Sequence, residues 1–168
     1  MKITANAASR KVGALNLIPL KNLSQATRVK IVRASIEYDK AVVDFRKECD
    51  EGLKKLKPEG FDEKMIKYAA ALNPTDDNRE EAEKQRAEEG FDEFKAEYGK
   101  VEADYRELIS KLAEEPIYTA NPPAFTDADF EDIAATLPSG DVTTITRDGQ
   151  TSEVGNDSIL GHIVAMLG

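Results

Sequence analysis

The chain has 168 residues and a formal net charge of −9, with one third of its residues charged, so it predicts one domain, at most with a small appended unit. Its single cysteine, Cys49, excludes an internal disulfide and a cysteine-based metal site. No apolar run is long enough to cross a bilayer and the segment after Met1 lacks the apolar core of a signal peptide, so we expect a cytoplasmic protein with no membrane contact.

The first third of the chain predicts a short helix followed by a long one. Apolar residues at helical spacing favour a helix over residues 5–17, which Pro19 ends. Leu23 and Ser24 then have the order of a hydrophobic staple and an N-cap, because a serine hydroxyl can accept a hydrogen bond from a free amide of the first turn. From Gln25 to Leu56 we expect one helix, about 48 Å long at 1.5 Å per residue.

Two apolar rows run along this long helix. The main row follows a spacing of three and four residues, with one step of seven where Gly52 takes the missing place, and consists of Ile31, Ser35, Tyr38, Val42, Phe45, Cys49 and Leu56. A second row consists of Val29, Val32, Ile36 and Val43. Two rows predict a wide buried surface that touches more than one other element.

A broken segment follows the long helix. Lys57, Pro58 and Gly60 stop it, a short helix is expected over Asp62–Leu72, and Asn73 and Pro74 break the chain again. The pentapeptide Glu-Gly-Phe-Asp-Glu occurs at 59–63 and at 89–93, which indicates a local duplication. Two copies do not predict a solenoid, which needs at least three repeats.

A second long helix is expected from Arg79 to Ala113. Its apolar seam has an unbroken spacing of three and four residues and consists of Phe91, Phe94, Tyr98, Val101, Tyr105, Leu108 and Leu112. Such a seam favours a helical partner, so the two long helices predict an antiparallel hairpin. An alternative stays open, in which Gly90 breaks the helix, the seam helix begins at Phe91, and 79–89 form a separate acidic segment.

The chain changes character after Pro116. A short strand over 117–119 precedes a helix over 128–137, which Thr126 and Asp129 open with the spacing of a capping box. Asp148 and Gly149 predict a tight turn between strands over 142–146 and 150–154, and a last helix follows. We therefore expect a mainly α fold with a helical hairpin domain at 1–115 and a small α+β unit, with a β-hairpin, at 116–168.

Charge is unevenly distributed along the chain. Residues 1–58 carry 13 Lys and Arg against 6 Asp and Glu, whereas residues 59–168 carry 10 against 26. We favour packing of the basic part beside the acidic part over a binding face of one sign. The basic residues near Arg28 lack the interleaved aromatic residues of a nucleic-acid surface, so a nucleic-acid partner is not expected.

The densest acidic run is either a solvated face or a mimic of a phosphate backbone, and consists of Glu80, Glu81, Glu83, Glu88 and Glu89.

No catalytic constellation emerges from the sequence. His162 is the only histidine and lies in an apolar segment, and Cys49 lies on a packing row, so structural roles are favoured for both. Oxygen ligands for a hard cation are conceivable in the acidic cluster of Asp127, Asp129, Glu131 and Asp132. The cluster lacks the glycine and distal glutamate of an EF-hand, and helix starts collect acids. We therefore expect no metal and no cofactor, and a metal-dependent enzyme is the least favoured interpretation.

Short segments resemble small helical proteins of tailed-phage and prophage structural-gene clusters. They are the opening Met1–Thr4, the basic segment Leu23–Ile31, the charged segment Tyr105–Ile109 and the acidic segment Phe125–Ile133. The stretch 57–90 departs from that plan, and no functional residue carries over. The resemblance implies a virion-assembly or accessory protein without catalytic activity.

Together these patterns predict a non-enzymatic interaction or assembly protein that self-associates or binds a protein through amphipathic helix surfaces. The alternative is an acidic inhibitor of a host defence or DNA-binding protein, acting through the glutamate run.

Overall fold

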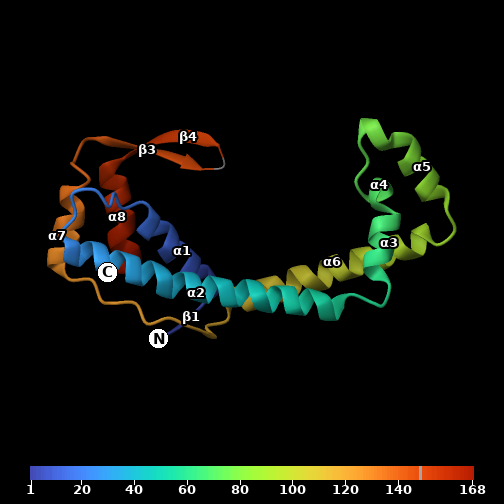
Figure 1. The fold of residues 1–168 in the computed structure, drawn as a ribbon, viewed down its shortest axis with the longest axis horizontal. Coiled ribbons are helices and arrows are strands. Elements are labelled where there is room, and N and C mark those ends of the chain that lie inside the picture. Colours follow the sequence, from blue (N-terminus) through green and yellow to red (C-terminus); the bar gives the residue numbers. More distant parts are fainter. Residues whose placement is uncertain (148) are drawn as a thin grey trace. The chain divides into compact units, whose positions relative to one another are not determined.

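The computed structural model describes residues 1–147 and 149–168 and divides them into two compact units. The terminal unit joins Met1–Phe45 to Ala113–Gly168, and the middle unit is Arg46–Leu112. This division differs from the expected boundary after residue 115, because the C-terminal segment shares one core with the first 45 residues. The predicted mainly α fold with a long helical hairpin and a C-terminal β-hairpin is confirmed (Figure 1).

The terminal unit combines helices with two small antiparallel sheets. Its elements are β1 (Lys2–Ile3), α1 (Ala5–Asn16), the first part of α2 (Gln25–Leu56), β2 (Tyr118–Thr119), α7 (Asp127–Ala135), β3 (Val142–Arg147), β4 (Gln150–Gly155) and α8 (Asn156–Leu167). β1 pairs with β2, so that Ile3 lies opposite Tyr118. β3 and β4 pair in the register that a two-residue turn requires, with Arg147 opposite Gln150. Gly149 has a φ of +77°, while its predicted turn partner Asp148 lies outside the described residues.

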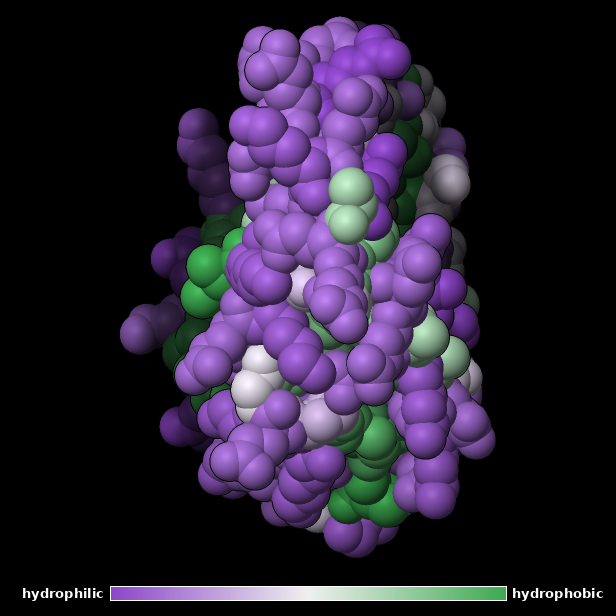
Figure 2. Space-filling model, turned by 90° about the vertical axis from the view of Figure 1, so that its right-hand side faces the viewer, coloured by the Kyte–Doolittle hydropathy of each residue, from purple (hydrophilic) through white to green (hydrophobic). Residues whose placement is uncertain are grey.

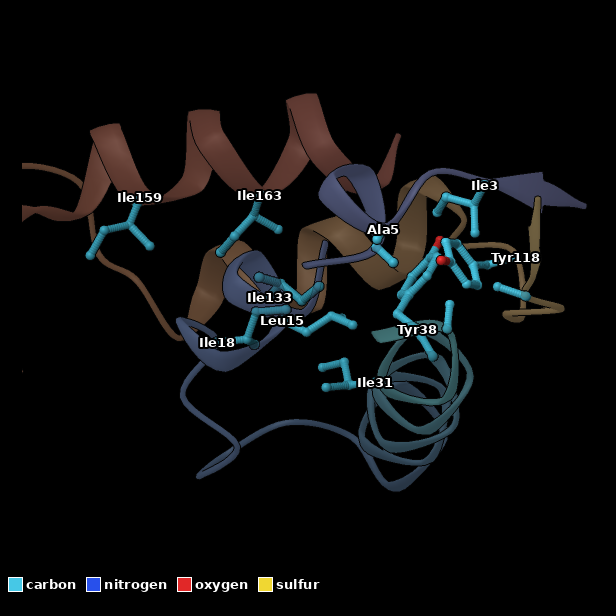
Figure 3. Packing of buried hydrophobic residues seen from close by; sticks show 14 of the residues in the cluster. Ile3, Ala5, Leu15, Ile18, Ile31, Tyr38, Tyr118, Ile133, Ile159 and Ile163 are labelled. Atoms are coloured by element: carbon cyan, nitrogen blue, oxygen red, sulfur yellow. The ribbon is translucent and has the colours of Figure 1, made fainter. Parts of the chain in front are cut away.

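The core of the terminal unit lies between α1, α2, α7 and α8 (Figure 3). Ile133 of α7 and Ile163 of α8 are fully buried, and Leu15 and Ile31 meet them from α1 and α2. At the other end of the cluster, Tyr118 of β2 makes an edge contact with Phe45, at 6.1 Å between ring centroids. Residues from both ends of the chain thus bury one apolar cluster, and α2 provides one of its walls.

The middle unit consists of the end of α2 and a set of helices that follow it. These are α3 (Phe61–Lys67), α4 (Ala69–Leu72), the 3₁₀ turn η1 (Asp76–Asn78), α5 (Arg79–Ala87) and α6 (Phe91–Glu114), whose last two residues belong to the terminal unit.

The helix expected over 62–72 is broken at Tyr68. The continuous helix expected from Arg79 is wrong, and the alternative start at Phe91 is confirmed. α5 ends at Ala87, and Gly90, directly before α6, has a φ of +92°, which favours glycine.

The apolar seam of α6 has the expected spacing, but it packs against α3 and α4 as well as against α2, the expected partner. Phe91 and Phe94 pack against Tyr68, at 5.4 Å between ring centroids in both pairs, and Phe94 also contacts Phe61. α2 runs antiparallel to α6 in this unit (Figure 1), and the side chain of Leu108 packs close over Gly52. The hairpin is therefore confined to the last part of α2, because the α2 residues before Arg46 belong to the core of the other unit.

Candidate interaction surface

The first part of α2 carries apolar side chains on two opposite faces. The inward face is buried and consists of Ile31, Ala34, Tyr38 and Ala41. The second row, which we call the outer row, consists of Val29, Val32, Ile36 and Val43, with 43%, 45%, 61% and 57% of each residue exposed. At 3.6 residues per turn the two sets point about 170° apart. The expectation that this second row is buried is therefore wrong, because the neighbouring elements cover only the opposite face.

A groove runs beside the middle of the outer row. Residues of α2 and residues from the end of α1 and the connection that follows line it: Ile31, Val32, Ser35 and Ile36 on α2, and Leu15, Asn16, Ile18 and Leu20 on the other side. Its volume is about 270 Å³. Leu20 is 43% exposed at its rim. We call this groove the α2 groove. With the outer row it forms an exposed, mainly apolar surface within the terminal unit, which Asp39 interrupts before Val43.

The connection that carries Leu20 is fixed at its far end. Leu23 is buried, and the hydroxyl of Ser24 accepts a hydrogen bond from the amide of Thr27 at 3.2 Å, as the predicted N-cap requires. Asn22 adopts a φ of +71°, which turns the chain into the cap. Leu20 is therefore held beside α2 by a defined path of the backbone.

A polar cluster locks the start of α2 to the start of α7. The ammonium of Lys30 lies 2.5 Å from the carboxylate of Asp129, which also accepts hydrogen bonds from the amide and hydroxyl of Thr126, both at 2.7 Å. Burial alone would raise the pKa of Asp129, but the hydrogen bonds from Lys30 and Thr126 outweigh it and lower this pKa from 3.8 to about 2. Asp132 accepts a further bond from the amide of Ser24 at 3.0 Å. This cluster orients α2 and with it the outer row.

The same contacts account for most of the acidic cluster that was considered as a cation site. Asp129 forms the predicted capping box with Thr126 and pairs with Lys30, and Asp132 caps α2, while Asp127 and Glu131 are exposed. Among the described residues, no three His, Cys, Asp or Glu side chains gather as metal ligands would. The structure therefore gives the metal-dependent alternative no assembled site.

Cationic side chains surround the α2 groove. Arg28, Arg33 and Lys40 flank the outer row on α2, and Lys21 follows Leu20 at the rim, and all four are exposed. Arg28 donates a hydrogen bond to the carbonyl of Leu23 at 3.3 Å. In the part of the chain that the structure describes, the ion pairs involve none of these four side chains. Two exposed carboxylates also lie beside the row: Asp39 interrupts it between Ile36 and Val43, and Asp44 follows Val43, so cations outnumber acids four to two around this surface.

The two seams predicted as interaction residues are largely used inside the protein. Phe91, Phe94, Val101, Ile31 and Tyr38 are buried. The remaining members are half-buried, and are Tyr98, Tyr105, Leu108, Leu112, Val42 and Phe45. Ile31, Tyr38, Val42 and Phe45 pack in the core of the terminal unit, and Phe91, Phe94, Tyr98 and Val101 pack in the core of the middle unit. The accessible apolar surface of the first part of α2 therefore lies on its other face.

The middle unit has a second apolar groove, of about 490 Å³. Leu53, Met65, Tyr98 and Val101 line it, and Ile66 stands at its edge with 79% of the residue exposed. Its rim carries both signs of charge, because Lys57 pairs with Asp62 at 2.6 Å.

The glutamate run is exposed along α5 and the turn after it. Figure 2 views the molecule from the side of α4 and α5, where hydrophilic side chains dominate and apolar ones show in separate places. Several of the five carboxylates have internal partners: Glu88 pairs with Lys67 at 2.6 Å, Glu83 pairs with Arg79 at 3.5 Å, and Glu81 accepts a hydrogen bond from Gln85. This surface is thus partly neutralised within the middle unit.

The two remaining candidate residues lie apart from these surfaces. His162 is exposed on α8. Cys49 is buried, and its burial, followed by the nearby charges of Asp50 and Glu48, raises the pKa of its thiol. A raised pKa lowers the thiolate fraction, which is unfavourable for a nucleophile.

No family model matches the chain, and neither a curated protein nor a solved structure matches it. In the described residues, each helix is too short or too polar to span a lipid bilayer. The interpretation of this protein therefore depends on its own surfaces.

Proposed function

We propose that this chain is a non-enzymatic interaction protein that binds a protein partner through the outer row and the α2 groove. One observation carries the proposal: the first part of α2 has apolar faces on opposite sides, and only one of them is covered. Single exposed apolar residues are common on proteins, but an aligned row beside a groove is typical of a docking site.

The energy available at this surface supports a modest interaction. Completing the burial of a half-exposed Val or Ile side chain contributes about 1 kcal/mol. Four such residues, with Leu20 and the groove, give several kcal/mol before the entropy lost on association is subtracted. That amount suits a regulated or assembling contact whose remaining affinity comes from charged neighbours.

The resemblance to phage and prophage structural-gene proteins supports a more specific setting. We propose that the contact serves virion assembly, or an accessory step of it, in the host cytoplasm or the virion. The short segments that resemble those proteins support this setting, and the exposed outer row supports the interaction itself.

A site-specific crosslink tests the interaction. A photoreactive amino acid is placed at Ile36 and, as a matched control on the same helix, at Lys54, and the protein is irradiated in the cells that produce it. We expect an adduct from position 36 that mass spectrometry identifies, that forms again from purified components, and that is lost when Val32 is changed to Lys. Equal labelling from positions 36 and 54, with a monomeric mass in solution, would contradict the proposal.

The acidic inhibitor is the second candidate. It is favoured by the exposure of all five glutamates, and disfavoured by the internal partners of Glu81, Glu83 and Glu88. Replacing the five glutamates with glutamine separates the two candidates. Under the inhibitor hypothesis partner binding is abolished, whereas binding through the α2 groove is unchanged.

A further inference from the structure

We propose that the occupant of the α2 groove is an amphipathic helix of another protein whose apolar seam is flanked by Asp and Glu. This inference rests on the proposed function, and it specifies the chemistry of the partner.

The apolar geometry indicates a helix. The outer row follows the spacing of three and four residues that is typical of a seam between two helices, with Asp39 in place of an apolar residue between Ile36 and Val43. From Val29 to Val43 it extends about 21 Å, which corresponds to about four helical turns. Leu20 gives the row a second wall, so the surface is concave beside Val32 and Ile36 and can receive the apolar edge of a helix.

The charges indicate that this helix is acidic. Arg28 and Arg33 lie on opposite sides of the row, Lys40 continues the side of Arg33, and Lys21 lies beside Leu20. Their side chains are exposed and long enough to reach carboxylates on a helix seated between them. Complementary charge at the rim of an interface selects the partner and accelerates its association.

The same charges disfavour a second copy of this chain. In a parallel pair of α2 helices Arg28 would face Arg33 of the other copy, and in an antiparallel pair the Arg33 and Lys40 sides would face each other. The acidic helices α5 and α6 of a second copy are not suitable occupants of the groove either. α5 buries Ala82 and Gln85, and α6 buries Phe94 and Val101, so their apolar sides are already covered.

A membrane surface fits this region less well than a helix. The outer row consists of Val and Ile, without the aromatic anchors that interfacial helices use, and the inward face of α2 is fixed in a folded core. The concave wall at Leu20 also suits a rod-shaped ligand better than a flat one.

Two designed peptides test the inference. Both are four-turn helices with the same Leu and Val seam, flanked in one by Glu and in the other by Lys, and binding is measured by fluorescence anisotropy at low and at physiological salt. We expect the acidic peptide to bind about tenfold more tightly than the basic one, and to weaken as salt is added. In the R33E/K40E variant the preference should reverse. The matched variant K54E/K55E changes the same charge at exposed positions elsewhere on α2, and should bind as the unchanged protein does.

The outcomes distinguish failure of the inference from failure of the proposed function. Equal binding of both peptides, or binding of neither, overturns the acidic helix. The interaction proposal still stands if the crosslink at position 36 joins a second copy, or if sedimentation shows a dimer that I36E dissociates. Binding to vesicles of anionic lipid that R33E/K40E abolishes, without peptide binding, overturns the acidic helix in favour of a membrane surface. Circular dichroism of each variant verifies that it is folded.

Discussion

Lys30 and Asp129 form an ion pair of 2.5 Å that joins the start of α2 to the start of α7, 99 residues further along the chain. The carboxylate has 7% of its side chain exposed and the lysine 31%, so the pair lies at the edge of the core. Because it sets the position of α2, it also sets the surface that we propose as the docking site.

Replacing Asp129 should destabilise the terminal unit in a pH-dependent way. The folded-state pKa of about 2 lies below the ordinary value of 3.8, so the ionised carboxylate stabilises the fold above pH 4, and this contribution is lost as the pH falls from about 4 towards 2. We expect Asp129→Asn to lower the free energy of unfolding by about 1–2 kcal/mol at pH 7, and to lose less stability than the unchanged protein on acidification. Urea unfolding at pH 7 and pH 3 measures both. Asp127→Asn, an exposed change in the same helical turn, is the control and should alter stability by less than about 0.5 kcal/mol.

Gly52→Ala should loosen the contact between α2 and α6 in the middle unit. A Cβ at Gly52 would lie 2.2 Å from Cδ2 of Leu108, so the leucine side chain must move. Overpacking of this kind costs about 1–3 kcal/mol, partly offset by the higher helix propensity of alanine. Gly99→Ala in α6 is the matched control, because nothing lies within 4 Å of its added methyl group, and it should stabilise by about 0.5–1 kcal/mol. Thermal unfolding that gives the same shift for both variants would contradict the contact.

Truncation should destabilise the protein strongly at Ile163 and hardly at all at Ile36. Ile163 is fully buried, and Ile163→Ala should cost about 2–5 kcal/mol through lost burial and the cavity that remains. Ile36 is 61% exposed, so Ile36→Ala should change the free energy of unfolding by less than about 0.5 kcal/mol. A large loss of stability at Ile36, measured by chemical denaturation, would mean that the outer row is covered in the free protein.

Cys49 should react slowly with thiol reagents at neutral pH. Its side chain is buried, and the same burial raises the pKa of the thiol, so both access and the thiolate fraction are low. We expect labelling by a disulfide reagent to proceed orders of magnitude more slowly than for a free thiol, and to accelerate in urea at the concentration where the middle unit unfolds. Rapid labelling of the native protein would show that this part of α2 opens readily.

Local signals in the sequence predict much of this fold. The bounds of α2 at Gln25 and Leu56, the cap at Ser24 and the capping box of Thr126 with Asp129 all agree with the structure, because each depends on a few neighbouring residues. The sequence alone does not decide whether the helix breaks at Gly90, because a glycine can lie within a helix or beside its end.

The features that the sequence did not predict depend on distant residues. β1 is only two residues long and exists because Tyr118 and Thr119 pair with it. Periodicity identifies both apolar rows of α2. Which row is buried depends on the face of α2 against which Ile133 and Ile163, from the last third of the chain, pack. The exposure of the outer row could have been predicted from its position well away from the main row and from its cationic flanks, since a helix in a small core rarely buries two separate faces.

The terminal unit is assembled from two stretches that the middle unit separates in the sequence. During synthesis its first 45 residues therefore leave the ribosome long before Ile163, which completes their core, has been made. At a translation rate of about 5–20 residues per second, both apolar faces of α2 stay open for roughly 6–24 s in each nascent chain. In that interval chaperones or other proteins can bind both apolar faces of α2. Only when α8 is complete is the inward face buried, so that the outer row alone stays accessible.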